Sequence, residues 1–332
     1  MKNNKSSSEK NLRPQTLNEY IGQKKIIQTL RLFVEGVKQR KFASEHLLMF
    51  GPPGIGKTTL AYVIANELKG TIKVTSGAAI QKGADLAAVL TNLSDNDILF
   101  IDEVHRLPKT IEEMLYPVLE EFVMDIIIGK GPSARTMRLQ IPKITIIGAT
   151  TKLALLSAPL RDRFGLILRL DYYNIQEMFF IVKRASSILN MVITDEAAHE
   201  IAIRSRKTPR IANRILKRAR DLIEVHKFKC IDKPLLTNLF NLLDIDNQGL
   251  SNIDVKYLKL VAERFQNLAV GIETIASSLS EDKKTVEEFI EPYLLQLGFI
   301  KKTTKGRIVT DKGLFHLGIK LTPVKVEQDK LV

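Results

Sequence analysis

Residues 51–58, Gly-Pro-Pro-Gly-Ile-Gly-Lys-Thr, match the pattern G-x-x-x-x-G-K-[ST]. An apolar run of strand length, residues 46–50, comes directly before them, and a helical segment, residues 58–68, follows. Glycines at this spacing let the chain curl tightly and point backbone N–H groups at an anion, while the helix adds its positive N-terminal end. The stretch therefore predicts a nucleotide phosphate site, with Lys57 on the outer phosphates and Thr58 holding Mg²⁺.

The segment from residue 46 to about 170 alternates apolar, strand-length runs with helical segments. This order predicts an α/β fold in which helices cover a parallel sheet. The predicted strands are residues 46–50, 71–75, 98–102, 144–149 and 166–170.

One pair of segments interrupts the alternation. Residues 123–128 and 135–141 flank a glycine- and proline-containing turn and predict an inserted β-hairpin. Three consecutive isoleucines, Ile126, Ile127 and Ile128, adjoin this turn. We favour a partner-docking surface for them over a simple sheet edge, because exposed apolar groups mark interaction sites.

A second motif ends the predicted strand 98–102, which runs Ile-Leu-Phe-Ile-Asp and is followed by Glu103. Asp102 would hold magnesium through water, and Glu103 would orient and partly deprotonate the water that attacks the γ-phosphate. The pair predicts ATP hydrolysis rather than kinase-type transfer. A strand that merely ends on surface carboxylates is the alternative, and the phosphate loop upstream disfavours it.

Two further motifs belong to the same predicted sheet. Thr150 ends a strand at the edge where ligands of parallel sheets bind, so it is a candidate γ-phosphate sensor, although small hydroxyl residues commonly end strands. Arg161 and Arg163 share one short segment, and an arginine aimed at a γ-phosphate is often supplied by a neighbouring subunit. Either arginine could instead pair with Asp162 or Asp171.

The remainder of the chain is predominantly helical. Helices are predicted to open at Asn174, at Thr194 and at Thr208-Pro209, and they form a small helical domain that ends at about Leu243. After a linker, helices at 252–266, 272–279 and 282–297 precede a hairpin at 299–310 that turns at Lys305-Gly306. This is the order of elements in a winged helix.

Bulk composition limits the class of protein. The 332 residues carry a net charge of +13, which indicates an anionic partner such as nucleic acid or, alternatively, a lysine-rich proteome. One cysteine, no tryptophan and no long apolar run disfavour a disulfide scaffold or a membrane protein, so we expect a cytoplasmic location.

These motifs together resemble the RuvB family, bacterial Holliday-junction branch-migration ATPases of the AAA+ superfamily. A phosphate loop occurs in every P-loop protein, whereas the Ile-Gly-Lys-Gly-Pro-Ser-Ala hairpin combined with a winged-helix end is specific. The resemblance is carried by residues 12–14, 20–23, 51–59, 75–77, 100–107, 128–134, 148–151, 159–165, 208–212, 291–295 and 306–310. The sequence departs from the family at Lys207 and at residues 266–270, where glycine is usual, and in the wing.

The resemblance implies a domain plan and a set of site residues. The plan is a tail (1–11), a large ATPase domain (12–171, hairpin 123–141), a helical lid (172–243), a winged-helix DNA-binding domain (244–322) and a second tail (323–332). Implied nucleotide contacts are Leu12, Arg13, Tyr20, Ile21, Gly54, Gly56, Lys57, Thr58, Thr59, Glu120, Glu121, Phe122, Tyr173 and Arg210, with Arg163 reaching a neighbour's nucleotide as a catalytic finger.

Arg210 would act as a second sensor that makes lid closure depend on the nucleotide, although Arg210, Arg214 and Arg218 could also form one solvated basic face. Lys302 and Arg307 would contact the DNA backbone, although a charged, solvated hairpin explains them almost as well.

The function implied is an ATP- and Mg²⁺-dependent DNA motor that forms a ring, hexameric by resemblance. It would drive branch migration of Holliday junctions with RuvA during recombination, DNA-damage repair and the SOS response, with the RuvC resolvase as a further partner. RuvA would dock on residues 123–141. The alternatives are a clamp-loader or replication-initiation ATPase, and a DNA-binding regulator that uses ATP as a switch. Glu103 disfavours the switch, which has little need of a water-activating carboxylate.

Overall fold

The computed structural model describes residues 12–40, 45–128 and 135–319. The chain divides into a first compact unit that ends at Ile231 and a second that begins at Asp232. The sequence predicts that the helical lid ends at about Leu243. In the structure the last helix of that range, α10 (Lys233–Leu242), belongs to the second compact unit. Both predicted tails lie outside the described residues. No described helix has the length and apolar character needed to cross a membrane.

The first unit contains a five-stranded parallel sheet in the order β2-β3-β6-β1-β7. Its elements are α2 (Lys24–Arg40), β1 (Leu47–Phe50), α3 (Lys57–Leu68), β2 (Ile72–Ser76), η1 (Gly77–Ala79), α4 (Gly83–Thr91), β3 (Ile98–Asp102), η2 (Val104–Arg106), α5 (Lys109–Glu121), β6 (Thr145–Thr150), η4 (Leu153–Leu155), α6 (Ala158–Asp162) and β7 (Leu166–Arg169). The five predicted strands are therefore confirmed to within one residue at each end.

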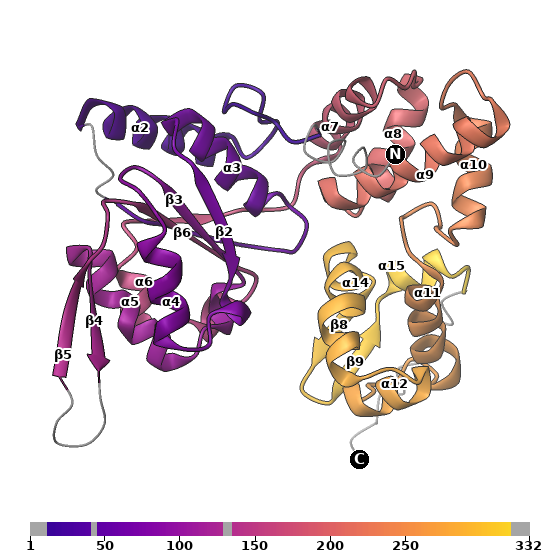
Figure 1. Cartoon of the computed structure of the whole chain (residues 1–332). Coiled ribbons are helices and arrows are strands. Elements are labelled where there is room, and N and C mark those ends of the chain that lie inside the picture. Colours follow the sequence, from indigo (N-terminus) through magenta and orange to yellow (C-terminus); the bar gives the residue numbers. More distant parts are fainter. Residues whose placement is uncertain (1–11, 41–44, 129–134, 320–332) are drawn as a thin grey trace, which may run out of the picture. The chain divides into compact units, whose positions relative to one another are not determined.

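The helices form two layers over this sheet. Figure 1 shows α2 and α3 on one face and α4, α5 and α6 on the other. The position of α3 opposite α4, α5 and α6 follows from right-handed crossovers, because the step from β1 to β2 runs across the sheet opposite to the steps from β2 to β3, β3 to β6 and β6 to β7. The apolar core under α4 and α5 includes Leu99, Ile101 and Ile146.

The inserted hairpin is confirmed as a separate two-stranded antiparallel sheet of β4 (Val123–Ile128) and β5 (Arg135–Gln140). The side chain of Ile126 is partly buried against the core beside α5. The side chains of Ile127 and Ile128 lie outside the described residues. The apolar side chain that β5 exposes is Met137.

Three helices complete the first unit: α7 (Ile175–Ile188), α8 (Asp195–Arg204) and α9 (Pro209–His226). Their predicted starts are confirmed by the structure. Asn174 and Glu177 cap α7 reciprocally, the Thr194 side chain accepts a bond from Ala197 N–H at 3.2 Å, and Pro209 opens α9.

The second unit continues with a winged helix. Its elements after α10 are α11 (Asn252–Lys259), η5 (Leu260–Arg264), α12 (Ile272–Leu279), α13 (Lys283–Thr285), η6 (Val286–Ile290), α14 (Glu291–Leu297), β8 (Ile300–Thr303), β9 (Gly306–Val309) and α15 (Asp311–His316). The predicted helix 282–297 contains a π-helical turn, η6, just before Pro292, whose ring cannot accept a regular preceding turn. The turn consists of Thr304 and Lys305 rather than Lys305 and Gly306, and α15 was not anticipated.

Candidate nucleotide-binding and hydrolysis site

The phosphate loop joins β1 to α3 and turns through left-handed backbone at glycine. Gly54 and Gly56 have φ angles of 80° and 104°. A Cβ atom on Gly56 would lie 2.8 Å from the Tyr20 hydroxyl, so that position requires glycine for space as well as for conformation. The tight curl predicted from the sequence is therefore present.

Lys57 begins α3 at the end of this loop. Its side chain is buried, and its Nζ donates hydrogen bonds of 2.8 Å to the carbonyl oxygens of Gly51 and Pro52. Burial lowers the pKa of Lys57 to about 8, while the carboxylates of Asp102 and Glu103 oppose that shift. A bound phosphate would add negative charge beside Lys57 and so stabilise its protonated, positively charged form.

The carboxylate pair stands at the end of β3. Asp102 Oδ1 accepts a hydrogen bond from Glu103 N–H at 3.0 Å. Glu103 has a φ angle of 50°, which is uncommon for a residue with a side chain and is typical of functional sites. The two side chains lie on the wall of one cavity with Lys57.

This cavity has a volume of about 490 Å³ and lies between the phosphate loop and α7 and α9. It collects most of the predicted nucleotide contacts: Leu12, Arg13, Tyr20, Ile21, Gly54, Gly56, Lys57, Thr58, Thr59, Asp102, Glu103, Tyr173 and Arg210. It is also lined by Thr151, from the motif that ends β6, and by residues that no sequence motif marked: Glu19, Ile181, Arg184, Ala185, Asn213 and Lys217. Helical spacing could have found two of them, because Asn213 and Lys217 lie on the same face of α9 as Arg210.

The donor set in this cavity fits a nucleotide with Mg²⁺. Thr58 supplies a hydroxyl and Asp102 a carboxylate, both oxygen ligands of the kind Mg²⁺ prefers, and Mg²⁺ in such sites is completed by water and phosphate. Among the described residues no group of three or more His, Cys, Asp or Glu side chains could hold a metal by itself.

Two tyrosines close the cavity beside the loop. The Tyr173 hydroxyl lies 3.1 Å from the Tyr20 hydroxyl and 3.1 Å from the Ile55 carbonyl oxygen. Burial raises the pKa of Tyr20 to about 12 and that of Tyr173 well above its usual value, so both remain neutral donors at physiological pH.

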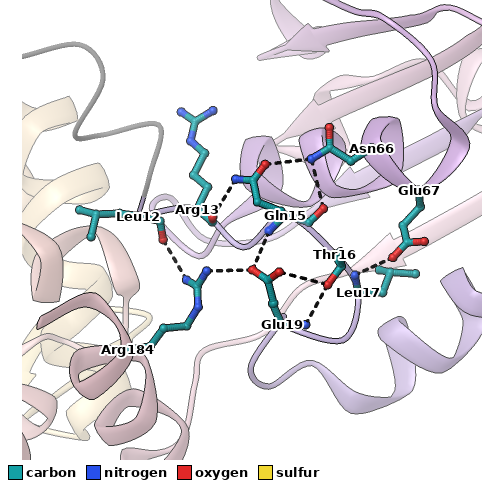
Figure 2. Close-up of polar contacts among 9 residues, drawn as sticks. All are labelled: Leu12, Arg13, Gln15, Thr16, Leu17, Glu19, Asn66, Glu67 and Arg184. Carbon is teal, nitrogen blue, oxygen red and sulfur yellow. Dashed lines mark hydrogen bonds and ion pairs between the residues drawn. The ribbon is translucent and has the colours of Figure 1, made fainter. Parts of the chain in front are cut away.

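The N-terminal segment, residues 12–19, is held from two sides, as Figure 2 shows. On the α3 side, Asn66 Nδ2 donates to the Gln15 carbonyl oxygen at 3.1 Å, and Leu17 N–H donates to Glu67 Oε1 at 2.9 Å. On the α7 side, Arg184 donates to the Leu12 carbonyl oxygen at 3.0 Å and to Glu19 Oε2 at 3.1 Å. The segment thus links α3 to α7, and both helices contribute residues to the cavity wall.

The start of α9 rests on the phosphate loop. Arg210 N–H donates to the Gly54 carbonyl oxygen at 3.3 Å, and the Arg210 side chain lines the cavity with Arg214. Arg218 instead forms a 2.9 Å ion pair with Asp221. Arg210, Arg214 and Arg218 are all exposed, so the alternative of one basic face on α9 also fits this helix.

The remaining predicted nucleotide residues do not line this cavity: Thr150, Arg163, Glu120, Glu121 and Phe122. Thr150 is buried, and the neighbouring Thr151 lines the cavity instead. Arg163 lies at the end of α6, where its Nε is 3.1 Å from Glu120 Oε1 and its guanidinium carbon is 4.3 Å from the centre of the Tyr116 ring. Arg163 and Glu120 thus form a second cluster.

In the winged helix, Arg307 and Lys302 point to one buried carboxylate. Glu291 is fully buried, and its oxygens lie 2.7 Å from Arg307 Nε and 2.7 Å from Lys302 Nζ. The Tyr257 hydroxyl donates to the same carboxylate at 3.1 Å. Arg307 is mostly buried by this arrangement, whereas Lys302 is half exposed.

The site combines a phosphate loop, a carboxylate pair at the end of a strand and an arginine from a helical lid. These features define a P-loop ATPase, and the chain adds a C-terminal winged helix. Family models match nearly the whole described chain: the Holliday junction DNA helicase RuvB P-loop domain at residues 12–170, the RuvB AAA lid domain at 173–246 and the RuvB C-terminal winged helix domain at 247–318. The chain belongs to the RuvB family.

Solved structures agree with this assignment. The RuvB Holliday junction branch migration motor of Thermotoga maritima is 44% identical, with a TM-score of 0.83 over 94% of this chain and 100% of that one. Two single-residue variants of the same protein are 45% and 44% identical, each over 94% of this chain and 99% of theirs, with TM-scores of 0.83 and 0.82.

Proposed function

We propose that this chain is an ATP-driven DNA motor that assembles as a hexameric ring on duplex arms and drives branch migration of Holliday junctions together with RuvA. The observation that carries the proposal is the single cavity that joins Lys57, the Asp102–Glu103 pair and the lid residue Arg210 in a chain of the RuvB family. The motor would act in the cytoplasm in recombination, DNA-damage repair and the SOS response, with RuvC as a further partner.

The roles within the cavity follow from its chemistry. Lys57 and the N–H groups of the loop bind the phosphates, Thr58 and Asp102 hold Mg²⁺, and Glu103 orients and activates the attacking water. Bound Mg²⁺ would neutralise developing charge on the phosphates. Arg210 connects the γ-phosphate to α9, so hydrolysis changes the angle of the lid.

Arg163 and residues 120–122 act on the nucleotide of an adjacent subunit. They lie outside the cavity of their own chain, and Arg163 is held by Glu120 and Tyr116, which suits a finger presented to a neighbour. Catalysis would then require assembly.

The DNA and RuvA contacts lie on the two hairpins. Lys302, joined by the exposed Lys301 and Lys305, neutralises phosphates without reading bases, while Arg307 holds the wing through Glu291. RuvA docks on β4 and β5, where Met137 is an exposed apolar side chain.

The test is a strand-exchange assay on a synthetic four-way junction with RuvA, ATP and Mg²⁺. We expect junction dissociation with the unmodified chain. Glu103→Gln should bind ATP normally, hydrolyse it at least about 100-fold more slowly and leave the junction intact. Strand exchange by Glu103→Gln at the unmodified rate, or none by the unmodified chain with active RuvA, would overturn the proposal.

A further inference from the structure

The phosphate loop is bonded to the lid at two successive carbonyl groups. Arg210 N–H donates to the Gly54 carbonyl oxygen at 3.3 Å, and the Tyr173 hydroxyl donates to the Ile55 carbonyl oxygen at 3.1 Å. Both donors belong to the lid domain, because Tyr173 precedes α7 and Arg210 lies in the first turn of α9. The lid therefore contacts the backbone of the loop as well as the cavity.

Close packing places the Tyr173 side chain against this part of the loop. A Cβ atom on Gly56 would lie 3.7 Å from the Tyr173 hydroxyl and 2.8 Å from the Tyr20 hydroxyl. A Cβ atom on Gly22 would lie 2.7 Å from Cε1 of Tyr173, so the backbone at Gly22 also confines the ring. Tyr173 as a whole is 3% exposed. Its hydroxyl thus has little freedom to leave Ile55 while the lid keeps its position.

Hydrogen-bond chemistry fixes the direction of these bonds. A carbonyl oxygen only accepts, so Tyr173 donates its one hydroxyl proton to Ile55. The Tyr173 oxygen lies 3.1 Å from the Tyr20 hydroxyl and therefore accepts the proton of Tyr20. Removing the Tyr20 hydroxyl would leave the bond to the loop intact, whereas removing the Tyr173 hydroxyl would break it.

The Ile55 carbonyl shares a peptide unit with the N–H of Gly56. This peptide is trans, so its C=O and N–H point in opposite directions and rotate together. Gly56 lines the cavity, whereas Ile55 does not. A hydrogen bond to the carbonyl oxygen thus fixes the rotation of the whole unit. The N–H of Gly56 then faces away from the tyrosine hydroxyl, in the direction open to an anion.

We propose that Tyr173 is a positioning residue for phosphate binding, whose hydroxyl holds the Ile55–Gly56 peptide so that the Gly56 N–H faces the phosphate. This inference rests on the proposed binding of nucleotide phosphates by the loop. A glycine backbone rotates more freely than that of any other residue, so the orientation of this peptide depends on a partner outside the loop. The hydroxyl of Tyr173 serves the loop and not the base or the ribose.

Removal of this hydroxyl should weaken the binding of phosphates and spare the binding of the nucleoside. In Tyr173→Phe the Ile55 carbonyl loses its donor and the peptide can rotate. Affinity for ADP should fall about fivefold, as expected for one neutral hydrogen bond. Inorganic pyrophosphate, which lacks base and ribose, should lose the same factor. Adenosine, which lacks phosphates, should bind within about twofold of its affinity for the unmodified chain.

The test is competition of ADP, pyrophosphate and adenosine against a fluorescent ADP on the full chain with Mg²⁺. Tyr20→Phe should lose less affinity for pyrophosphate than Tyr173→Phe does, because its bond from Tyr173 to Ile55 remains. Tyr172→Phe is the matched control. Tyr172 is a half-buried neighbour that does not line the cavity, so this variant should bind all three probes normally. Thermal melting establishes that each variant is folded.

Three results would each overturn the assignment: unchanged affinity of Tyr173→Phe for pyrophosphate, an equal loss for adenosine, or an equal loss in Tyr20→Phe. An equal loss for adenosine would place the hydroxyl at the nucleoside. Failure of the underlying phosphate site is distinguishable. Pyrophosphate would then fail to bind the unmodified chain, or would bind Lys57→Ala just as tightly.

Discussion

At the scale of single residues, His46 is a buried histidine outside the catalytic site. Its Nδ1 accepts a 2.9 Å hydrogen bond from Ile146 N–H, which joins the start of β1 to β6. Burial lowers the pKa of His46 to about 4, because the imidazolium ion loses its hydration. The neutral ring is therefore part of the folded core.

This shift predicts an acid-sensitive first unit. Between pH 6.5 and 4 the unfolded chain protonates His46 while the folded chain does not, so stability falls as the pH falls through that window. We expect His46 to contribute a loss of about 1 kcal/mol between pH 7 and 5.5. Chemical denaturation at the two pH values measures it. His46→Asn keeps an acceptor for Ile146 but does not titrate, so an equally steep pH dependence in that variant would contradict the assignment.

Left-handed backbone also occurs at residues other than glycine. Lys207 has a φ angle of 56°, and Gln266 and Asn267 have angles of 49° and 56°. These are conformations in which glycine is favoured and a Cβ costs energy. Lys207, Gln266 and Asn267 adopt these conformations because the surrounding elements determine the backbone.

At the scale of elements, the wing depends on a buried charge. Burial disfavours the Glu291 carboxylate, but Arg307 and Lys302 outweigh that cost and hold the pKa of Glu291 below its usual value. The approach of β9 to Val270 adds to this, since a Cβ on Gly306 would lie 2.3 Å from the Val270 carbonyl oxygen. The wing is therefore anchored to α14 and to the segment before α12.

Glu291→Gln should destabilise the winged helix strongly. It leaves the mostly buried Arg307 without its main counter-charge, and loss of one partner of a buried pair costs about 3 kcal/mol or more. Glu287→Gln is the matched control, because Glu287 contacts Arg307 at 3.4 Å from an exposed position and should contribute less than about 1 kcal/mol. Urea denaturation compares the two. Equal losses would show that burial of Glu291 is not what matters.

The N-terminal segment gives a second prediction at this scale. Arg184→Ala removes the contacts from α7 to Leu12 and Glu19 that Figure 2 shows, so the cavity should be less well closed over a nucleotide. We expect ATP and ADP to bind about tenfold more weakly, with kcat largely retained. Fluorescent-nucleotide titration measures this. Lys183→Ala, next along α7 and paired with Asp195, should bind normally, and equal weakening in both variants would rule out a specific role for the segment.

At the scale of the whole molecule, the position of Arg163 predicts catalysis shared between subunits. Arg163→Ala lacks the finger but keeps its own cavity, whereas Lys57→Ala lacks phosphate binding but keeps the finger. Mixing the two inactive variants under conditions of assembly should restore part of the ATPase activity. In an equal mixture, at most about a quarter of the interfaces combine an intact Lys57 with an intact Arg163. Steady-state hydrolysis detects this, and its absence from co-assembled rings would place Arg163 in another role.

The chain's class could be read from its sequence because the decisive features are local. A phosphate loop requires glycines and Lys-Thr within eight residues, and a buried strand ending in Asp-Glu is equally compact. Helix starts at Asn174, Thr194 and Pro209 follow from capping rules that act over three residues. These interactions are specified by neighbours in the chain, so sequence determined the fold class, the family and most of the cavity.

Only the tertiary structure decided which member of each motif lines the cavity and which partner a charged side chain contacts. Thr151 rather than Thr150 lines the cavity, Arg184 joins it from α7, and Arg307 turns to Glu291. His105 carried no metal-ligand spacing, yet it contacts Thr150 and Glu103. Such partners are up to 172 residues apart in the chain, as Leu12 and Arg184 are, and their contact depends on how separate elements pack. No local pattern of side chains encodes that packing.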